Sequence, residues 1–145
     1  MKRYLSKEWI SGLLVLAVVA GFILWLAIPS RASADPAVTK HTFAGGELTW
    51  SILNYPAIVL DDNHFSIAIQ DAADAALHAT SLQIKLDMIG MLCGDYTFDL
   101  VETSPGVYEG DGIPLMAGLW KATLTIRLGD GQTVKISRSL KAVYS

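Results

Sequence analysis

The stretch WKATLTIRL, residues 120–128, alternates apolar and polar side chains along its whole length. A period of two is typical of a β-strand that has one face on a core and the other in water. The same alternation recurs in three other stretches, residues 65–70, 81–88 and 96–100. A Gly129-Asp130-Gly131 turn joins the first stretch to a further extended run, residues 133–144, and this favours a hairpin.

Turn signals separate these runs at intervals of about 8 to 12 residues, which is the pattern of an antiparallel sandwich. Residues 47–53 and the short run 107–109, which follows a Ser104-Pro105-Gly106 turn, bring the expected number to about seven strands. Residues 71–80, DAADAALHAT, are rich in alanine but too short for a stable helix, so we interpret them as a loop. The sequence therefore predicts an all-β fold.

Residues 10–28, ISGLLVLAVVAGFILWLAI, carry no charge. Crossing a bilayer takes about 20 apolar residues, so this run predicts one N-terminal transmembrane helix or signal anchor. Lys2, Arg3 and Lys7 precede the run, and the positive-inside tendency then places residues 1–9 in the cytoplasm and the rest of the chain outside. A cleaved signal peptide is the alternative, because residues 32–34, Ala-Ser-Ala, form a small-x-small cleavage pattern.

Residues 29–39 are rich in Ser, Ala and Pro and are interpreted as a linker, followed by one domain over residues 40–145. The chain of 145 residues is long enough for one such domain and an anchor, and too short for a multidomain enzyme. From residue 35 onward, seven basic and thirteen acidic side chains leave a net charge of -6. Without clustered positive charge, we expect no binding to nucleic acid or to anionic lipid.

Residues 87–95, DMIGMLCGD, bring two methionines and the one cysteine of the chain together at the end of a predicted strand. Thioether and thiolate are soft donors that select Cu(I), so Met88, Met91 and Cys93 are candidate ligands. Met116, near the start of the 120–128 strand, is a fourth. Packing is the alternative for each methionine, because methionine commonly fills cores. Cys93 has three alternatives: a buried thiol, an intermolecular bridge or a metal ligand.

Other polar residues do not form a pattern that indicates catalysis. The histidines lack the spacing of a zinc or Cu(II) site and are expected at the surface or at strand edges: His41, His64 and His78. Asp61-Asp62-Asn63 lacks the oxygen spacing of an EF-hand and is expected to form a turn. Three carboxylates are interpreted as the solvated edge of a hairpin: Glu102, Glu109 and Asp111. With no nucleophile and base in a recognisable arrangement, we expect no enzyme.

Residues 104–110, SPGVYEG, followed by residues 113–122, IPLMAGLWKA, resemble the "GxYxG... MxGxW" signature of the YtkA-like domain, a group associated with FixH-type proteins. The resemblance covers about residues 65–136. It implies an immunoglobulin-like sandwich outside the membrane, with a role in copper handling or oxidase assembly. By position, three residues match family methionines: Met88, Met91 and Met116. Cys93 stands where relatives often have histidine, which keeps a soft donor but changes the ligand set.

Two functions follow from these observations. The first is a membrane-anchored, extracytoplasmic module that holds Cu(I) through Met88, Met91, Cys93 and Met116 and passes it to a partner in copper delivery or oxidase assembly. The second is a metal-free interaction domain whose strand edge or face docks on a membrane complex during its assembly.

Overall fold

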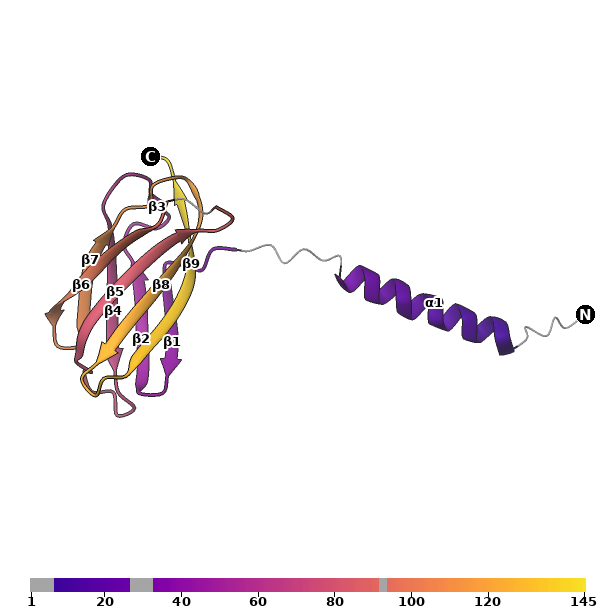
Figure 1. The fold of residues 1–145 in the computed structure, drawn as a ribbon, viewed down its shortest axis with the longest axis horizontal. Helices are drawn as coiled ribbons and strands as arrows, with labels where there is room; N and C mark the ends of the chain where they lie inside the picture. The colour runs from indigo at the N-terminus through magenta and orange to yellow at the C-terminus, as the bar shows by residue number, and fades with distance from the viewer. Residues whose placement is uncertain (1–6, 27–32, 92–93) are drawn as a thin grey trace, which may run out of the picture. The chain divides into compact units, whose positions relative to one another are not determined.

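The computed structural model describes residues 7–26, 33–91 and 94–145, and the chain divides into two compact units, residues 1–32 and 33–145 (Figure 1). The first unit contains one helix, α1 (Lys7–Leu26), in a stretch without proline. Among the described residues, no helix combines the length and hydropathy needed for a membrane span.

The second unit is built from strands, which confirms the all-β prediction for this part of the chain. Nine strands are described: β1 (Val38–Phe43), β2 (Gly46–Ile52), β3 (Ala57–Ile58), β4 (Asn63–Gln70), β5 (Ala79–Met88), β6 (Tyr96–Ser104), β7 (Val107–Gly112), β8 (Gly118–Leu128) and β9 (Thr133–Val143). About seven were expected. The two extra strands are β3, which has only two residues and hence no periodicity, and β1, which begins inside the predicted linker.

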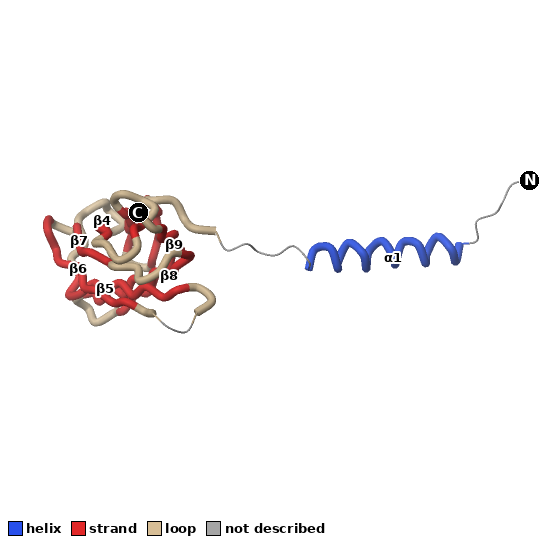
Figure 2. Tube along the Cα trace, turned by 90° about the horizontal axis from the view of Figure 1, so that it is seen from above, coloured by secondary structure: helices blue, strands red, loops and turns tan. Residues whose placement is uncertain are grey.

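The strands form one mixed sheet in the order β1-β2-β4-β7-β6-β5-β8-β9-β3, and all neighbours are antiparallel except β3 and β9. β6 lets this sheet curl, because its first half pairs with β5 and its second half with β7. Seen from above, β4 and β7 lie on one side, β5 and β8 on the other, and β6 at the turn between them (Figure 2).

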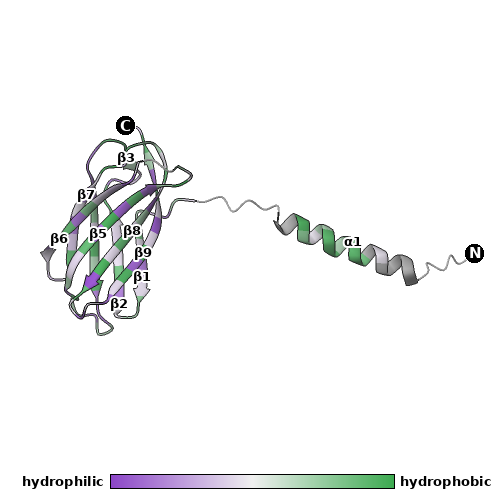
Figure 3. Cartoon of the chain, viewed as in Figure 1, coloured by the Kyte–Doolittle hydropathy of each residue, from purple (hydrophilic) through white to green (hydrophobic). Residues whose placement is uncertain are grey.

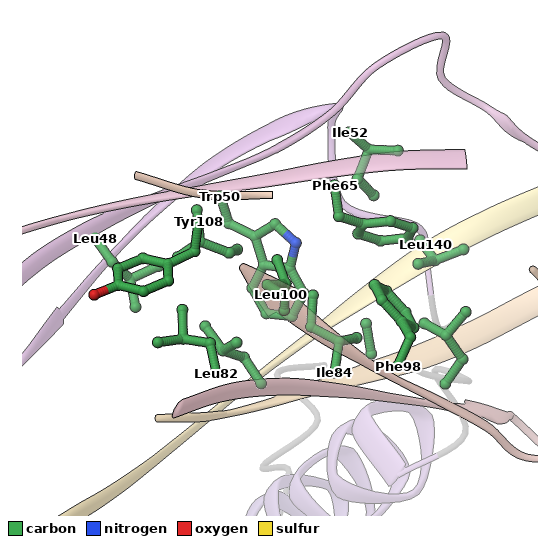
Figure 4. Close-up of a cluster of buried hydrophobic side chains, with 14 of the residues drawn as sticks. Leu48, Trp50, Ile52, Phe65, Leu82, Ile84, Phe98, Leu100, Tyr108 and Leu140 are labelled. Atoms are coloured by element: carbon green, nitrogen blue, oxygen red, sulfur yellow. The ribbon is translucent and has the colours of Figure 1, made fainter. Parts of the chain in front are cut away.

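A single apolar core fills the space between the two halves of the curled sheet (Figure 4). The alternation predicted for residues 120–128 is confirmed: Trp120, Leu124 and Ile126 are fully buried, whereas Lys121 and Arg127 are exposed. Figure 3 shows this alternation as hydrophobic (green) and hydrophilic (purple) residues along the strands. Phe65 of β4 and Phe98 of β6 meet across the core with ring centroids 5.1 Å apart. Parity along each strand therefore decides which side chains are buried.

Residues 71–78 form a loop as expected, whereas the last two residues of the predicted loop 71–80 already belong to β5. The conformation of the loop is fixed locally, because Asp71 Oδ1 accepts hydrogen bonds from the backbone N–H groups of Ala73 and Ala75 at 2.8 and 2.9 Å. The Gly129–Gly131 hairpin between β8 and β9 also forms, with Leu128 and Gln132 bonded across it.

Residues 33–37, which the sequence assigns to a linker, are instead part of the second compact unit. Arg138 of β9 holds them: its buried guanidinium donates hydrogen bonds to the carbonyls of Pro36, Ala37 and Trp50. Asp35 adds a carboxylate that accepts hydrogen bonds from the backbone N–H and the hydroxyl of Ser139. A segment with the composition of a linker can thus have a fixed structure when a buried guanidinium donates hydrogen bonds to its backbone carbonyls.

Candidate metal centre

Met88 occupies the last position of β5 and lies opposite Trp120 of β8. Its side chain is partly buried and packs against the core. The thioether methyl fills the space over Gly118, because a Cβ built on that glycine would lie 2.6 Å from Met88 Cε. Gly118 has a φ of +149°, which also favours glycine, so the start of β8 is shaped to admit this methionine.

Met116 lies two residues before Gly118, in the loop that leads into β8. Its carbonyl accepts a hydrogen bond of 2.9 Å from the indole Nε1 of Trp120, and its side chain is partly buried against the core. Met88 and Met116 therefore lie at the same end of neighbouring strands, one ending β5 and the other just before β8. Their packing against the core is the alternative role that the sequence left open.

Met91 lies in the loop after β5, and half of its side chain is exposed. Its backbone N–H approaches the carbonyl of Met88 at 3.4 Å, which turns the chain back over the end of β5. Cys93, the fourth predicted ligand, lies outside the described residues. The described candidate ligands thus comprise two partly buried thioethers and one exposed thioether at one end of the sheet.

The carboxylates that flank this segment are already paired with a cation. Lys85 Nζ lies 2.8 Å from Asp87 Oδ1 and 3.3 Å from Asp95 Oδ2. These contacts, with Asp87 the stronger, raise the pKa of Lys85, so the lysine stays protonated at neutral pH. One oxygen of each carboxylate thus contacts the lysine, and the soft donors of the segment are its thioethers.

The histidines lie on different strands and loops, and of the three only His64 is at the end of the sheet that holds the methionines. His64 Nδ1 is 2.9 Å from Asp111 Oδ1, and its Nε2 is 3.8 Å from Glu109 Oε1. The hydrogen bond to Asp111 is the main cause of a raised His64 pKa. The two carboxylates face opposite ring nitrogens, so they do not converge with the imidazole on one point. No group of three His, Cys, Asp or Glu side chains within the described parts of the chain is arranged to hold a metal ion.

His78 Nδ1 contacts Glu102 Oε1 at 2.7 Å, far along the strands from Met88. Glu102 also accepts a hydrogen bond of 2.9 Å from the N–H of Gly106, which is the main cause of its lowered pKa, with His78 a smaller one. His41 contacts Thr39 on β1, and burial lowers its pKa, with the nearby Arg138 charge a second cause. These histidines and carboxylates act in local pairs.

Two polar residues that organise the unit were missed by the sequence interpretation. Arg138 is 3% exposed, and its guanidinium lies 5.6 Å from the Trp50 ring centroid. Its parity matches the inward-facing Ile136 and Leu140, and that signal could have found it. Asn63 is 4% exposed, although the sequence predicts a turn for it together with Asp61. Nothing in the spacing distinguishes it from an ordinary turn asparagine.

Asn63 fixes the loop that precedes β4. Its Oδ1 accepts the N–H of Ile58 at 2.7 Å, and its Nδ2 donates to the carbonyls of Ile58 and Asp61 at 2.9 and 2.8 Å. A longer bond of 3.3 Å reaches the Gly112 carbonyl at the end of β7. One buried amide therefore sets the shape of residues 58–62 at the end of the sheet that also holds Met88 and Met116.

Neither family models nor curated proteins give a match to this chain. Among solved structures, it is similar to an engineered protein (TM-score 0.47, 14% identity), sharing 81% of this chain and 22% of that one. It is also similar to the PmoD soluble domain from Methylocystis sp. Rockwell (TM-score 0.47, 10% identity, 74% of this chain and 97% of that chain). A third is a CARDB domain from Pyrococcus furiosus in complex with di-metal ions (TM-score 0.37, 15% identity, 72% and 100%). At these scores, no ligand or activity is transferred to this chain.

Proposed function

We propose that this chain is a membrane-anchored, extracytoplasmic, immunoglobulin-like sandwich of the YtkA-like type that binds Cu(I) and delivers it to a partner. The observation that carries the proposal is the gathering of Met88, Met91 and Met116 at one end of the sheet. The anchor and the orientation rest on the uncharged run 10–28 and the basic residues before it.

The arrangement of the thioethers suits transfer of a soft cation. Met88 and Met116 are partly buried against the core, whereas Met91 is half exposed and can meet an incoming ion or acceptor first. Thioethers bind without losing a proton, so their affinity for Cu(I) changes little with pH. Cys93 adds a fourth donor from sequence alone; it binds as thiolate, which releases a proton on metal binding.

Titration of reduced residues 33–145 with Cu(I), in competition with a chromogenic chelator at two pH values, tests the proposal. Wild type is expected to compete, and Met88→Leu combined with Met91→Leu is expected to remove most of that competition. Methionine-to-leucine exchange nearly conserves volume, so stability should change by less than about 1.5 kcal/mol. Cys93→Ser should weaken binding and flatten its pH dependence, because an ordinary thiol has a pKa of about 8.5.

His78→Gln is the matched control, because His78 is a potential ligand at the opposite end of the strands. It should leave competition for Cu(I) unchanged. Met116→Leu then decides whether the loop before β8 supplies a ligand or only packs. A wild-type unit that fails to hold copper, or a double variant that holds it equally well, would remove the copper function.

The second candidate is a metal-free interaction domain that assists assembly of a membrane complex. It is supported by the core packing of Met88 and Met116, which accounts for both methionines without a metal. β1 also lies at the edge of the sheet order, with β2 as its strand partner among the described residues. In the copper titration, this candidate predicts no competition by wild type.

A further inference from the structure

Exposed apolar side chains gather at one end of the folded unit. We define the apolar end as the loops 53–62, 89–91 with 94–95, and 113–117, together with residues 144–145; it is the upper end in Figure 1. Among the described residues of this unit, all exposed large hydrophobic side chains except Val101 lie at or beside it: Val38, Leu53, Leu60, Ile89, Met91, Leu115 and Tyr144. Such a one-sided concentration indicates an interaction site.

The loops of the apolar end are joined into one surface. The N–H of Leu60 donates to the carbonyl of Pro114 at 2.9 Å, and the N–H of Val59 donates to that of Val143 at 3.0 Å. Leu115 reaches the loop after β5, since its Cδ1 lies 3.9 Å from a Cβ built on Gly94. Side chains from separate loops can therefore act together.

The exposed side chain of Leu60 is not explained by the stability of the folded unit. Its φ is +58°, in the left-handed region, and 72% of the residue is exposed. The other non-glycine residues described with positive φ are Asn54 and Asp74, whose types tolerate this conformation. A leucine costs backbone strain at such a position and here buries little in return. The buried Asn63 nevertheless holds the loop in this shape.

The chain enters the folded unit at the apolar end. The Ala37 carbonyl accepts the N–H of Ile52, the last residue of β2, and β1 starts at the next residue. Six residues, 27–32, connect the end of α1 to Ser33, and such a connection reaches at most about 25 Å. If the run 10–28 is held in a bilayer, as proposed above, the apolar end stays within reach of the lipid surface.

We propose that the apolar end inserts its leucines and Met91 into the interfacial region of the bilayer to which the chain is anchored. The carboxylates of Asp61, Asp62 and Asp95 are exposed at this end, so attraction to anionic headgroups does not drive the contact. Apolar insertion into a zwitterionic surface fits both the side chains and the charge. This inference rests on the proposed anchorage and is independent of copper.

Residues 33–145 contain every residue of the core, so this unit can be tested by itself without copper. The probe is a phosphatidylcholine vesicle, and binding is measured by flotation. Wild type should float with the vesicles, and replacing a fifth of the lipid by phosphatidylglycerol at low salt should reduce binding. Leu60→Asn should weaken binding about tenfold, as expected when one leucine no longer leaves water.

Leu60→Asn should melt no lower than wild type, because asparagine suits the left-handed conformation; loss of binding then reports the surface and not the fold. Leu115→Ser should also weaken binding, whereas Val101→Ser, an exposed residue away from this end, should leave it unchanged. The inference is overturned if wild type does not float, if Leu60→Asn and Leu115→Ser bind like wild type, or if Val101→Ser is equally impaired. It is also overturned if the unit dimerises through Leu60 without lipid, which would make a second copy the occupant.

Discussion

The loops at the two ends of the folded unit are fixed by different chemistry. At the polar end, which comprises the loops 44–45, 71–78, 105–106 and 129–132, carboxylates bind nearby backbone N–H groups. Asp71, Glu102 and Asp130 each accept such a hydrogen bond, at 2.8 to 2.9 Å. At the apolar end, Asp61 Oδ1 accepts one bond of this kind, from the N–H of Asp62 at 3.0 Å. The buried Asn63 amide and the Trp120 indole, however, supply further bonds to backbone there, and leucines face solvent.

The two ends therefore have different roles: the polar end connects the strands, and the apolar end presents side chains that can contact a ligand. The polar end needs only to reverse the chain, and short turns with local carboxylates do this without exposing apolar surface. At the apolar end, buried groups support the loops from below, so their outer side chains are free to contact lipid, metal or a partner. The methionines and the exposed leucines thus share one scaffold, with Trp120 beneath it.

The largest expected effect is at Trp120, which supports the apolar end. Trp120→Ala removes a fully buried side chain and the indole hydrogen bond to the Met116 carbonyl. The loss should be about 3 to 5 kcal/mol of the roughly 5 to 15 kcal/mol that stabilises a domain. Urea unfolding of residues 33–145 measures it. Trp120→Phe, which keeps an aromatic ring, should cost clearly less; an unchanged midpoint for the alanine variant would contradict the assigned core position.

An intermediate effect is expected from the turn of the polar end. Gly106 has a φ of +74°, and a Cβ there would lie 2.8 Å from the Ile69 carbonyl oxygen. Gly106→Ala should therefore destabilise the unit by about 1 to 3 kcal/mol in the same urea assay. Gly129→Ala is the control, because nothing lies within 4 Å of its added Cβ; it should change stability by less than about 0.5 kcal/mol. Equal effects of the two substitutions would show that the Gly106 turn is not fixed as described.

The smallest expected effect is a pH dependence of opposite sign at the two ends. The His64 pKa is raised above 6.5, chiefly by Asp111, so its contribution to stability is present below pH 6.5 and lost as pH rises through the folded pKa. The Glu102 pKa is lowered below 4.5, chiefly by the Gly106 N–H, so its contribution is present above pH 4.5 and lost as pH falls through the folded pKa.

Melting temperatures of wild type, His64→Gln and Glu102→Gln, measured from pH 3 to pH 9, resolve these two contributions. His64→Gln should differ from wild type less above neutral pH than at pH 6, and Glu102→Gln should differ less at pH 3 than at pH 6. A constant offset at all pH values would mean that neither pairing depends on ionisation.

Much of the fold was predictable because parity is a local property. The alternation in residues 120–128 and 65–70 places Trp120, Phe65 and Ile67 on one face of their strands, and all three are fully buried. The loop at residues 71–78 and the Gly129–Gly131 hairpin were predictable for the same reason, since both depend on nearby residues. β3 was not predictable, because its two residues owe their strand geometry to pairing with Ala142 and Val143.

The sequence predicted which residues could act as donors in the candidate site, but not how they are arranged in space. Sequence proximity brings Met88 and Met91 together, but the contact of Met88 with Gly118 depends on the pairing of β5 with β8. Cys93 lies outside the described residues and keeps its place in the ligand set from sequence alone. The exposure of Leu60 also could not be read from the chain, because a leucine between Val59 and Asp61 is equally compatible with a buried position.

The sequence by itself determined seven of the nine described strands, their inward faces and the soft donors beside Gly90, because these depend on side-chain type and a period of two. Parity in the sequence places Arg138 on the inward face of β9, but only the tertiary structure shows how a cation is accommodated there, and it alone decided that Leu60 lies outside. A buried cation is stable only where carbonyls converge on it, here from residues 36, 37 and 50, which are distant in sequence. Leu60 is held in solvent by Asn63 and Pro114, so its position too depends on contacts that no local pattern encodes.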